Sequence, residues 1–111
     1  MRRIIVNTLH TLGYSNLTEA INGRDAIDKL GQRSFDLIIT DWNMPVMDGI
    51  TLTYLLKHSK DHQDIPILMV TTRSAQEDIV AAIKAGVNGY IVKPFSPDTL
   101  KSKIEQVLAD I

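Results

Sequence analysis

Three polar residues, Asp41, Thr71 and Lys93, each end or follow a short apolar run of the sequence. Apolar runs of this kind are typical of buried strands in parallel sheets. Because parallel strands bring their carboxyl ends to one edge, we expect the three side chains to converge there. A carboxylate, a hydroxyl and an ammonium at one edge suit phosphoryl transfer. Asp41 would attack phosphorus and become an aspartyl phosphate, while Thr71 and Lys93 would bind the phosphoryl oxygens.

Each of these residues also has an ordinary interpretation. Asp41 could be a turn or helix-cap acid, Thr71 a plain strand residue and Lys93 a solvated charge. Tyr90, which opens the last apolar run, could be a static half-buried residue or a moving one. The case for chemistry therefore depends on Asp41, Thr71 and Lys93 meeting at one rim.

The hydrophobic pattern predicts the elements that would position these groups. Helices are expected from Met1 to Leu12, through Ala26 to near Gly31, from Ile50 to Lys57, from a capping box at Ser74–Glu77 to Gly86, and after Ser96 through Leu108. Strands are expected at 17–20, 36–40, 67–71 and 90–92. Alternating helices and strands predict an α/β fold, a parallel sheet with helices on both faces.

Composition excludes several classes of protein. The chain has 111 residues, which suits one domain, and a formal net charge of −1, which favours neither nucleic acid nor an anionic membrane as a partner. No apolar run approaches the length of a membrane span. Cysteine is absent, which excludes disulfides and thiolate metal sites and fits a cytoplasmic protein.

The segment 35–49, which reads Phe-Asp-Leu-Ile-Ile-Thr-Asp-Trp-Asn-Met-Pro-Val-Met-Asp-Gly, resembles the phosphoacceptor region of two-component receiver domains, chiefly the chemotaxis branch. Lys93-Pro94-Phe95 is similar to the family's lysine segment. The resemblance implies a flavodoxin-like (CheY-like) fold and phosphorylation of Asp41 by a histidine kinase. It also implies that Thr71 and Tyr90 switch the surface that the target binds. The implied target is the flagellar motor switch, or a phosphatase.

The resemblance also implies Mg²⁺, held by Asp41 and the main-chain carbonyl of Asn43 together with two adjacent acids on a first strand. Here Met1–Ile4 aligns with the family's first helix, so residues 1–111 resemble a receiver domain truncated at its amino terminus. We therefore expect weak Mg²⁺ binding and slow or absent phosphorylation, because two protein ligands are few for an octahedral ion.

The first strand lies in the middle of the family's sheet, so its loss should weaken the fold. Burying about five apolar side chains contributes on the order of 8–15 kcal/mol, as much as the whole net stability of a domain, about 5–15 kcal/mol. Three remedies are open. The strand at 17–20 could pair directly with the strand at 36–40, a second copy could cover the exposed edges as a homodimer, or upstream residues could be missing from this sequence.

Two functions remain as hypotheses. The first is a phosphoacceptor signalling switch, with at most slow self-dephosphorylation and no enzymatic turnover. The alternative is a truncated interaction or dimerisation module that acts without phosphorylation and binds metal weakly.

Overall fold

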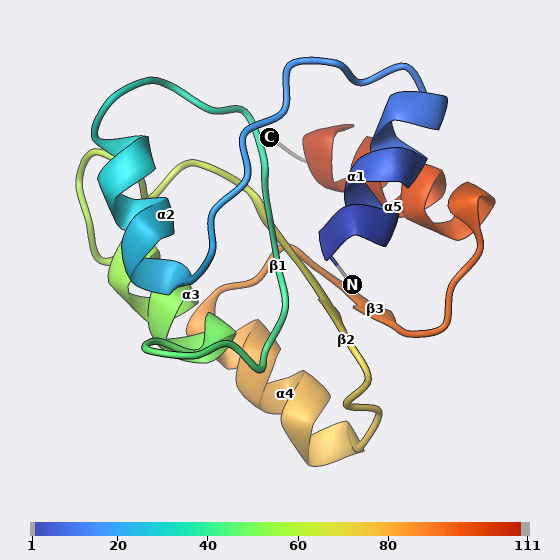
Figure 1. Cartoon of the computed structure of the whole chain (residues 1–111). Coiled ribbons are helices and arrows are strands. Elements are labelled where there is room, and N and C mark those ends of the chain that lie inside the picture. Colours follow the sequence, from blue (N-terminus) through green and yellow to red (C-terminus); the bar gives the residue numbers. More distant parts are fainter. Residues whose placement is uncertain (1, 110–111) are drawn as a thin grey trace.

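The computed structural model describes residues 2–109 of the chain. Five helices lie in this part: α1 (Arg2–Thr11), α2 (Gly23–Leu30), α3 (Gly49–Lys57), α4 (Gln76–Ala85) and α5 (Pro97–Ala109). Three strands lie between them: β1 (Ile38–Thr40), β2 (Ile67–Thr71) and β3 (Gly89–Val92) (Figure 1). None of the described helices is long and apolar enough to cross a membrane.

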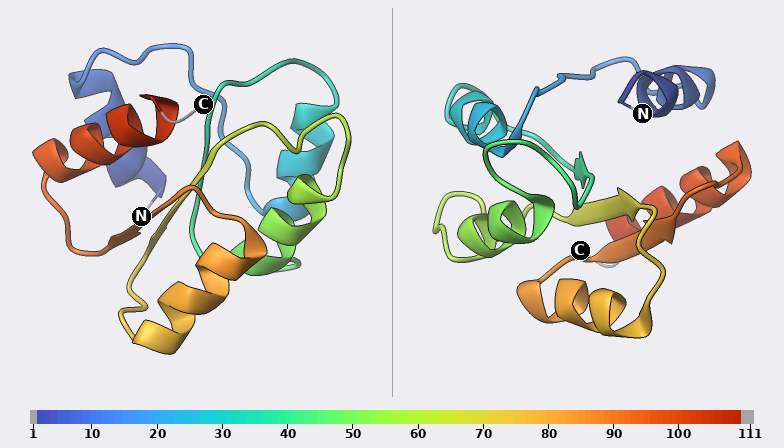
Figure 2. Two further views of the ribbon diagram at one scale, coloured as in Figure 1. Left: turned by 180° about the vertical axis from the view of Figure 1, so that it is seen from behind. Right: turned by 60° about the horizontal axis from the view of Figure 1, so that its bottom comes forward.

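The three strands form one parallel sheet in the order β1-β2-β3. Helices α1 and α5 cover one face, and α2, α3 and α4 cover the other (Figures 1 and 2). The predicted α/β class, with a parallel sheet between two layers of helices, is confirmed.

Strand β2 forms the centre of the core. All five of its residues are buried, with Ile67, Leu68, Met69 and Val70 fully inaccessible to solvent. Leu68 and Val70 pack with α1 and α5, whereas Ile67 and Met69 pack with the helices of the opposite face. The unbroken apolar run in the sequence follows from this burial on both faces.

The strand expected at 17–20 is absent, so that prediction is wrong, as is its proposed pairing with 36–40. The segment lies between α1 and α2 outside the described sheet, and side chains from α2 and from the turn after it contact it. Lys29 donates a hydrogen bond to the carbonyl of Glu19, and Arg33 donates one to the side chain of Asn16. Strand β1 is also shorter than expected and begins at Ile38.

The helices differ in whether a side chain caps their first turn. Asn22 caps α2 and Asp48 caps α3, each side chain accepting a backbone N–H at 2.8 Å. The capping box expected at the start of α4 is absent: its N-cap residue is Ala75, and no side chain caps the helix. Ser74 lies one residue too early to serve as the cap.

The amino end of the sheet is closed by a polar network around Asn88. The side-chain oxygen of Asn88 accepts hydrogen bonds from the N–H of Ile67 at 2.9 Å and from the Lys57 ammonium at 3.1 Å. Lys57 also donates to the carbonyl of Ile65 at 3.1 Å. Burial lowers the pKa of Lys57, while the neighbouring Asp64 opposes that effect. These bonds join the end of α3 to the starts of β2 and β3.

A cavity of about 680 Å³ runs along the edge of β1 that faces away from β2, bordered by α1, α2 and residues 13–22, and we name it the β1 groove. Ile38 donates its N–H to Pro66 at 3.0 Å, on the β2 side. Since main-chain groups of a parallel strand alternate in direction, those of Leu37 and Ile39 face the groove. Asp41 lines the groove just after the carboxyl end of β1. The groove occupies one whole edge of the sheet.

Candidate functional site

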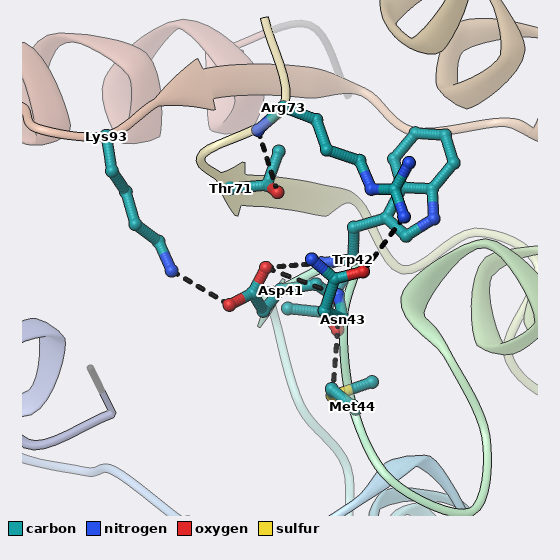
Figure 3. A network of polar contacts seen from close by, with 8 residues as sticks. Asp41, Trp42, Asn43, Met44, Thr71, Arg73 and Lys93 are labelled. Carbon is teal, nitrogen blue, oxygen red and sulfur yellow. Dashed lines mark hydrogen bonds and ion pairs between the residues drawn. The ribbon is translucent and has the colours of Figure 1, made fainter.

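Asp41 and Lys93 form an ion pair at the carboxyl edge of the sheet. Asp41 directly follows β1 and Lys93 directly follows β3, and the parallel arrangement places both at the same rim. The Lys93 Nζ lies 2.8 Å from Asp41 Oδ2, and the Lys93 side chain is only 8% exposed. The other carboxylate oxygen, Oδ1, accepts the N–H of Trp42 at 2.6 Å. The carboxylate is thus held between an ammonium and a main-chain donor (Figure 3).

Thr71 ends β2 on the same rim and is fully buried. Its carbonyl accepts the N–H of Lys93 at 2.8 Å, which ties the ends of β2 and β3 together. Its hydroxyl accepts the N–H of Arg73 at 3.3 Å. In the described structure the Thr71 hydroxyl is therefore bonded to the following loop and not to Asp41.

Tyr90 lies on β3, and its hydroxyl donates to the carbonyl of Arg73 at 2.8 Å. Burial raises the pKa of Tyr90 above 10.0, as do the charges of Asp78 and Asp41, and the charge of Arg73 lowers it. The phenol is thus favoured in its neutral, donating form. Tyr90 fastens β3 to the loop between β2 and α4.

The raised pKa of Tyr90 makes a prediction for alkaline pH. The folded-state pKa exceeds the ordinary value of 10.0, so Tyr90 contributes stability that is fully present below pH 10 and is lost as pH rises through the folded-state pKa. The part of the tyrosinate absorbance that is lost in the Tyr90→Phe variant belongs to Tyr90. In the folded protein this part should therefore titrate above pH 10. Titration of that absorbance at or below the value in denaturant would contradict the prediction.

Arg73 joins the loop after β1 to the start of α4, a connection that the sequence did not predict. Its guanidinium lies 4.5 Å from the centre of the Trp42 ring and donates to the side-chain oxygen of Asn43 at 3.0 Å. It also forms an ion pair with Asp78 of α4, at 3.7 Å. Figure 3 shows the side chain extending from the end of β2 over Trp42.

Gly49 sets the path of the loop that carries Asp41, a role that sequence reasoning also missed. Its N–H donates to the carbonyl of Trp42 at 2.8 Å. A Cβ at this position would lie 2.1 Å from the carbonyl oxygen of Asp41, a distance that atoms cannot reach. The signal in the sequence was the pair Asp48-Gly49, which indicated only a turn and a cap.

The described residues do not supply a full set of ligands for Mg²⁺. The predicted ligands are the carboxylate of Asp41, whose two oxygens already contact Lys93 and the N–H of Trp42, and the carbonyl of Asn43. Within residues 2–109 no group of three or more His, Cys, Asp or Glu side chains could hold a metal. Mg²⁺ prefers six oxygen ligands, so two protein donors leave most positions to water.

Comparison of the sequence with known proteins identifies its relatives. Residues 1–105 match the family model "Response regulator receiver domain". The chain is 49% identical over 109 residues to the chemotaxis protein CheY homolog of Campylobacter jejuni, covering 97% of this chain and 84% of that protein. It is 48% identical to the chemotaxis protein CheY1 of Helicobacter pylori, covering 97% and 88%.

Comparison of the structure agrees. The chemotaxis protein CheY4 of Vibrio cholerae superposes with a TM-score of 0.86 at 36% identity, covering 96% of this chain and 88% of that one. The receiver domain of a Pseudomonas aeruginosa sensor histidine kinase, solved with magnesium in its active-site cleft, superposes with a TM-score of 0.87 at 27% identity, covering 97% and 88%. The chain belongs to the response regulator receiver domain family, as a two-component signalling switch of the CheY chemotaxis type.

Proposed function

We propose that Asp41 is the phosphoacceptor of this switch and that a histidine kinase is its phosphoryl donor. The observation that carries the proposal is the contact between Asp41 and Lys93, because a nearly buried ammonium on the carboxylate can balance charge when a phosphoryl group arrives. The main-chain donor of Trp42 orients the same carboxylate.

In the proposed reaction an oxygen of Asp41 attacks the phosphorus of a phosphohistidine. The new O–P bond forms as the N–P bond breaks, and the leaving imidazole takes up a proton. Lys93 would then bind a phosphoryl oxygen, and the Thr71 hydroxyl would turn from the N–H of Arg73 to donate to another. We propose that Asp41 and the carbonyl of Asn43 bind Mg²⁺ only weakly.

The output would be a protein contact, and hydrolysis of the aspartyl phosphate would be slow compared with enzymatic turnover. Movement of Thr71 would change the environment of Tyr90 through Arg73, which contacts both residues. The target would be a flagellar motor switch protein or a phosphatase, and this protein would bind it in the cytoplasm. The resemblance to chemotaxis proteins supports this choice of partner.

The decisive experiment is Asp41→Asn, tested with a labelled phosphohistidine donor. We expect labelled phosphate to be transferred to the unaltered protein in a bond that is stable to acid and labile to base, and no transfer to the variant. Asp48→Asn is the matched control, since Asp48 lies in the same loop but serves as the cap of α3. Equal labelling of Asp41→Asn and the unaltered protein would refute the assignment.

A second candidate function is an interaction or dimerisation module that works without phosphorylation. The β1 groove favours it, because main-chain groups of Leu37 and Ile39 border a cavity of about 680 Å³ with largely apolar walls. A free strand edge beside such a cavity can accept an extended segment of another chain.

Light scattering after size-exclusion chromatography distinguishes the two candidates. A module of this kind should be a dimer over a wide range of concentration, and Asp41→Asn should leave its mass and partner binding unchanged. A monomer whose partner binding depends on phosphorylation of Asp41 would exclude the second candidate.

A further inference from the structure

The start of α4 is held less firmly than the starts of α2 and α3. Those two helices have side-chain caps, whereas α4 begins at Ala75 without one. One tie that remains is the ion pair between Arg73 and Asp78, in the first turn of α4. Its atoms are 3.7 Å apart and its side chains are 39% and 29% exposed, so the tie is weak.

The Arg73 guanidinium is shared between two parts of the molecule. NH1 faces Asp78, NH2 donates to Asn43, and the plane of the group lies over Trp42. Its Nε atom is buried and has no hydrogen-bond partner in the described structure. A buried donor without a partner is uncommon, and it leaves Arg73 able to gain a bond if an oxygen atom comes near.

The main chain of Arg73 has one contact that the proposed movement of Thr71 does not break. Its carbonyl accepts the hydroxyl of Tyr90 at 2.8 Å. A change of charge nearby can therefore reorient the guanidinium while Tyr90 still holds the loop.

The site around Asp41 would need a second cation once it carried a phosphoryl group. In the unmodified protein the single charge of the carboxylate is balanced by Lys93 at 2.8 Å. A phosphoryl group brings about two negative charges, Lys93 can balance only one, and the Mg²⁺ that would offset the rest is proposed to bind only weakly. Arg73 already contacts Asn43, two residues after Asp41, and its planar group can bind two phosphoryl oxygens at once.

We propose that Arg73 is a charge-operated latch: Asp78 holds it in the unmodified protein, and a dianionic group on residue 41 draws it away from Asp78 and so releases the first turn of α4. This inference rests on the proposed function, because phosphorylation of Asp41 would be the natural source of the dianion. It makes Arg73 a positioning residue that links the phosphoacceptor to the outer surface of α4.

The first test needs neither a phosphoryl donor nor a metal. Asp78→Asn removes the competing charge, so amide hydrogen exchange at residues 77–80 should rise about twofold to fivefold, the range expected for loss of a partly exposed ion pair. The matched control is Glu77→Gln, which removes a neighbouring charge of the same helix turn and should leave those rates within twofold. Unchanged exchange in Asp78→Asn, or an equal rise in Glu77→Gln, would overturn the latch.

The second test supplies the dianion chemically. The chain contains no cysteine, so Asp41→Cys offers a single thiol that a thiosulfonate reagent can label with a phosphonate. The phosphonate should speed exchange at residues 77–80 and change the emission of Trp42, whereas a neutral methyl label should do neither. In an Arg73→Met background the phosphonate should have no effect on exchange. A phosphonate effect of equal size without Arg73 would refute the proposal, and if the cysteine variant does not fold, the Asp78→Asn exchange rates decide it alone.

The experiments distinguish failure of the proposed phosphorylation of Asp41 from failure of the Arg73 latch. If Asp41 accepts no phosphate from any donor, the proposed function fails, but the Asp78→Asn exchange rates and the phosphonate response still decide the latch. If Asp41 is phosphorylated and exchange in α4 does not depend on Arg73, the latch alone fails.

Discussion

Replacing Gly49 with alanine is expected to lower the free energy of unfolding by about 2–4 kcal/mol. The new Cβ would lie 2.1 Å from the carbonyl oxygen of Asp41 and 3.0 Å from a methyl group of Met69. Neither a carbonyl oxygen in a closed loop nor a buried side chain can retreat by the required distance without moving its neighbours. The loop after β1 would shift, and Asp41 would shift with it.

Urea unfolding followed by circular dichroism measures this effect, and Gly31→Ala is its control. Gly31 has φ −73° and ψ −14°, which alanine adopts readily, and a Cβ there would lie 3.4 Å from its nearest neighbour. We expect Gly31→Ala to change stability by less than about 1 kcal/mol. Equal stability of Gly49→Ala and Gly31→Ala would show that the close approach to Asp41 is not part of the folded protein.

Removing the charge of Asp41 should destabilise the protein by about 1–3 kcal/mol through Lys93. The Lys93 side chain is 8% exposed, so its ammonium would be left nearly buried without an anion. The variant Asp41→Asn keeps an oxygen for the N–H of Trp42 and isolates the loss of charge. The effect stays below that of a fully buried pair because the Asp41 side chain is 28% exposed.

A double-mutant cycle with Lys93→Met tests this explanation. If the unpaired ammonium is the cause, Asp41→Asn combined with Lys93→Met should be about 1–2 kcal/mol more stable than the sum of the single effects implies. Urea unfolding of the four proteins gives the coupling energy. Additive effects would mean that the ion pair contributes nothing to stability, and that Asp41→Asn acts through some other contact.

Elements that carry their own periodic pattern could be predicted from the sequence, and elements that depend on a partner could not. The apolar run of β2 and the helical pattern of α3 were predicted correctly because each is a local property. The segment at 17–20 has strand-like composition, but a strand exists only where another strand pairs with it. In the structure Lys29 and Arg33 hold that region instead.

The same division applies to the site. Asp41 and Lys93 could be placed together because both follow strands of one parallel sheet, so topology fixes their neighbourhood. Arg73 follows Asn43 by 30 positions in the sequence. Its contacts with Asn43 and Trp42 depend on the rotamer of a long side chain. No spacing rule marks such contacts, and the close approach of Gly49 to Asp41 is likewise visible only in three dimensions.

The two ends of the sheet serve different purposes. The polar network of Asn88 and Lys57 stabilises the amino end, and the proposed switch lies at the carboxyl end. That network clamps the amino ends of β2 and β3, and the groups proposed to move all lie at the opposite ends. Substitutions at the clamped end should therefore alter thermal resistance without altering signal strength, whereas substitutions at the other end should alter the signal and, at Gly49 or Asp41, the stability as well. Selection could then change heat tolerance at the amino end of the sheet without changing the signal.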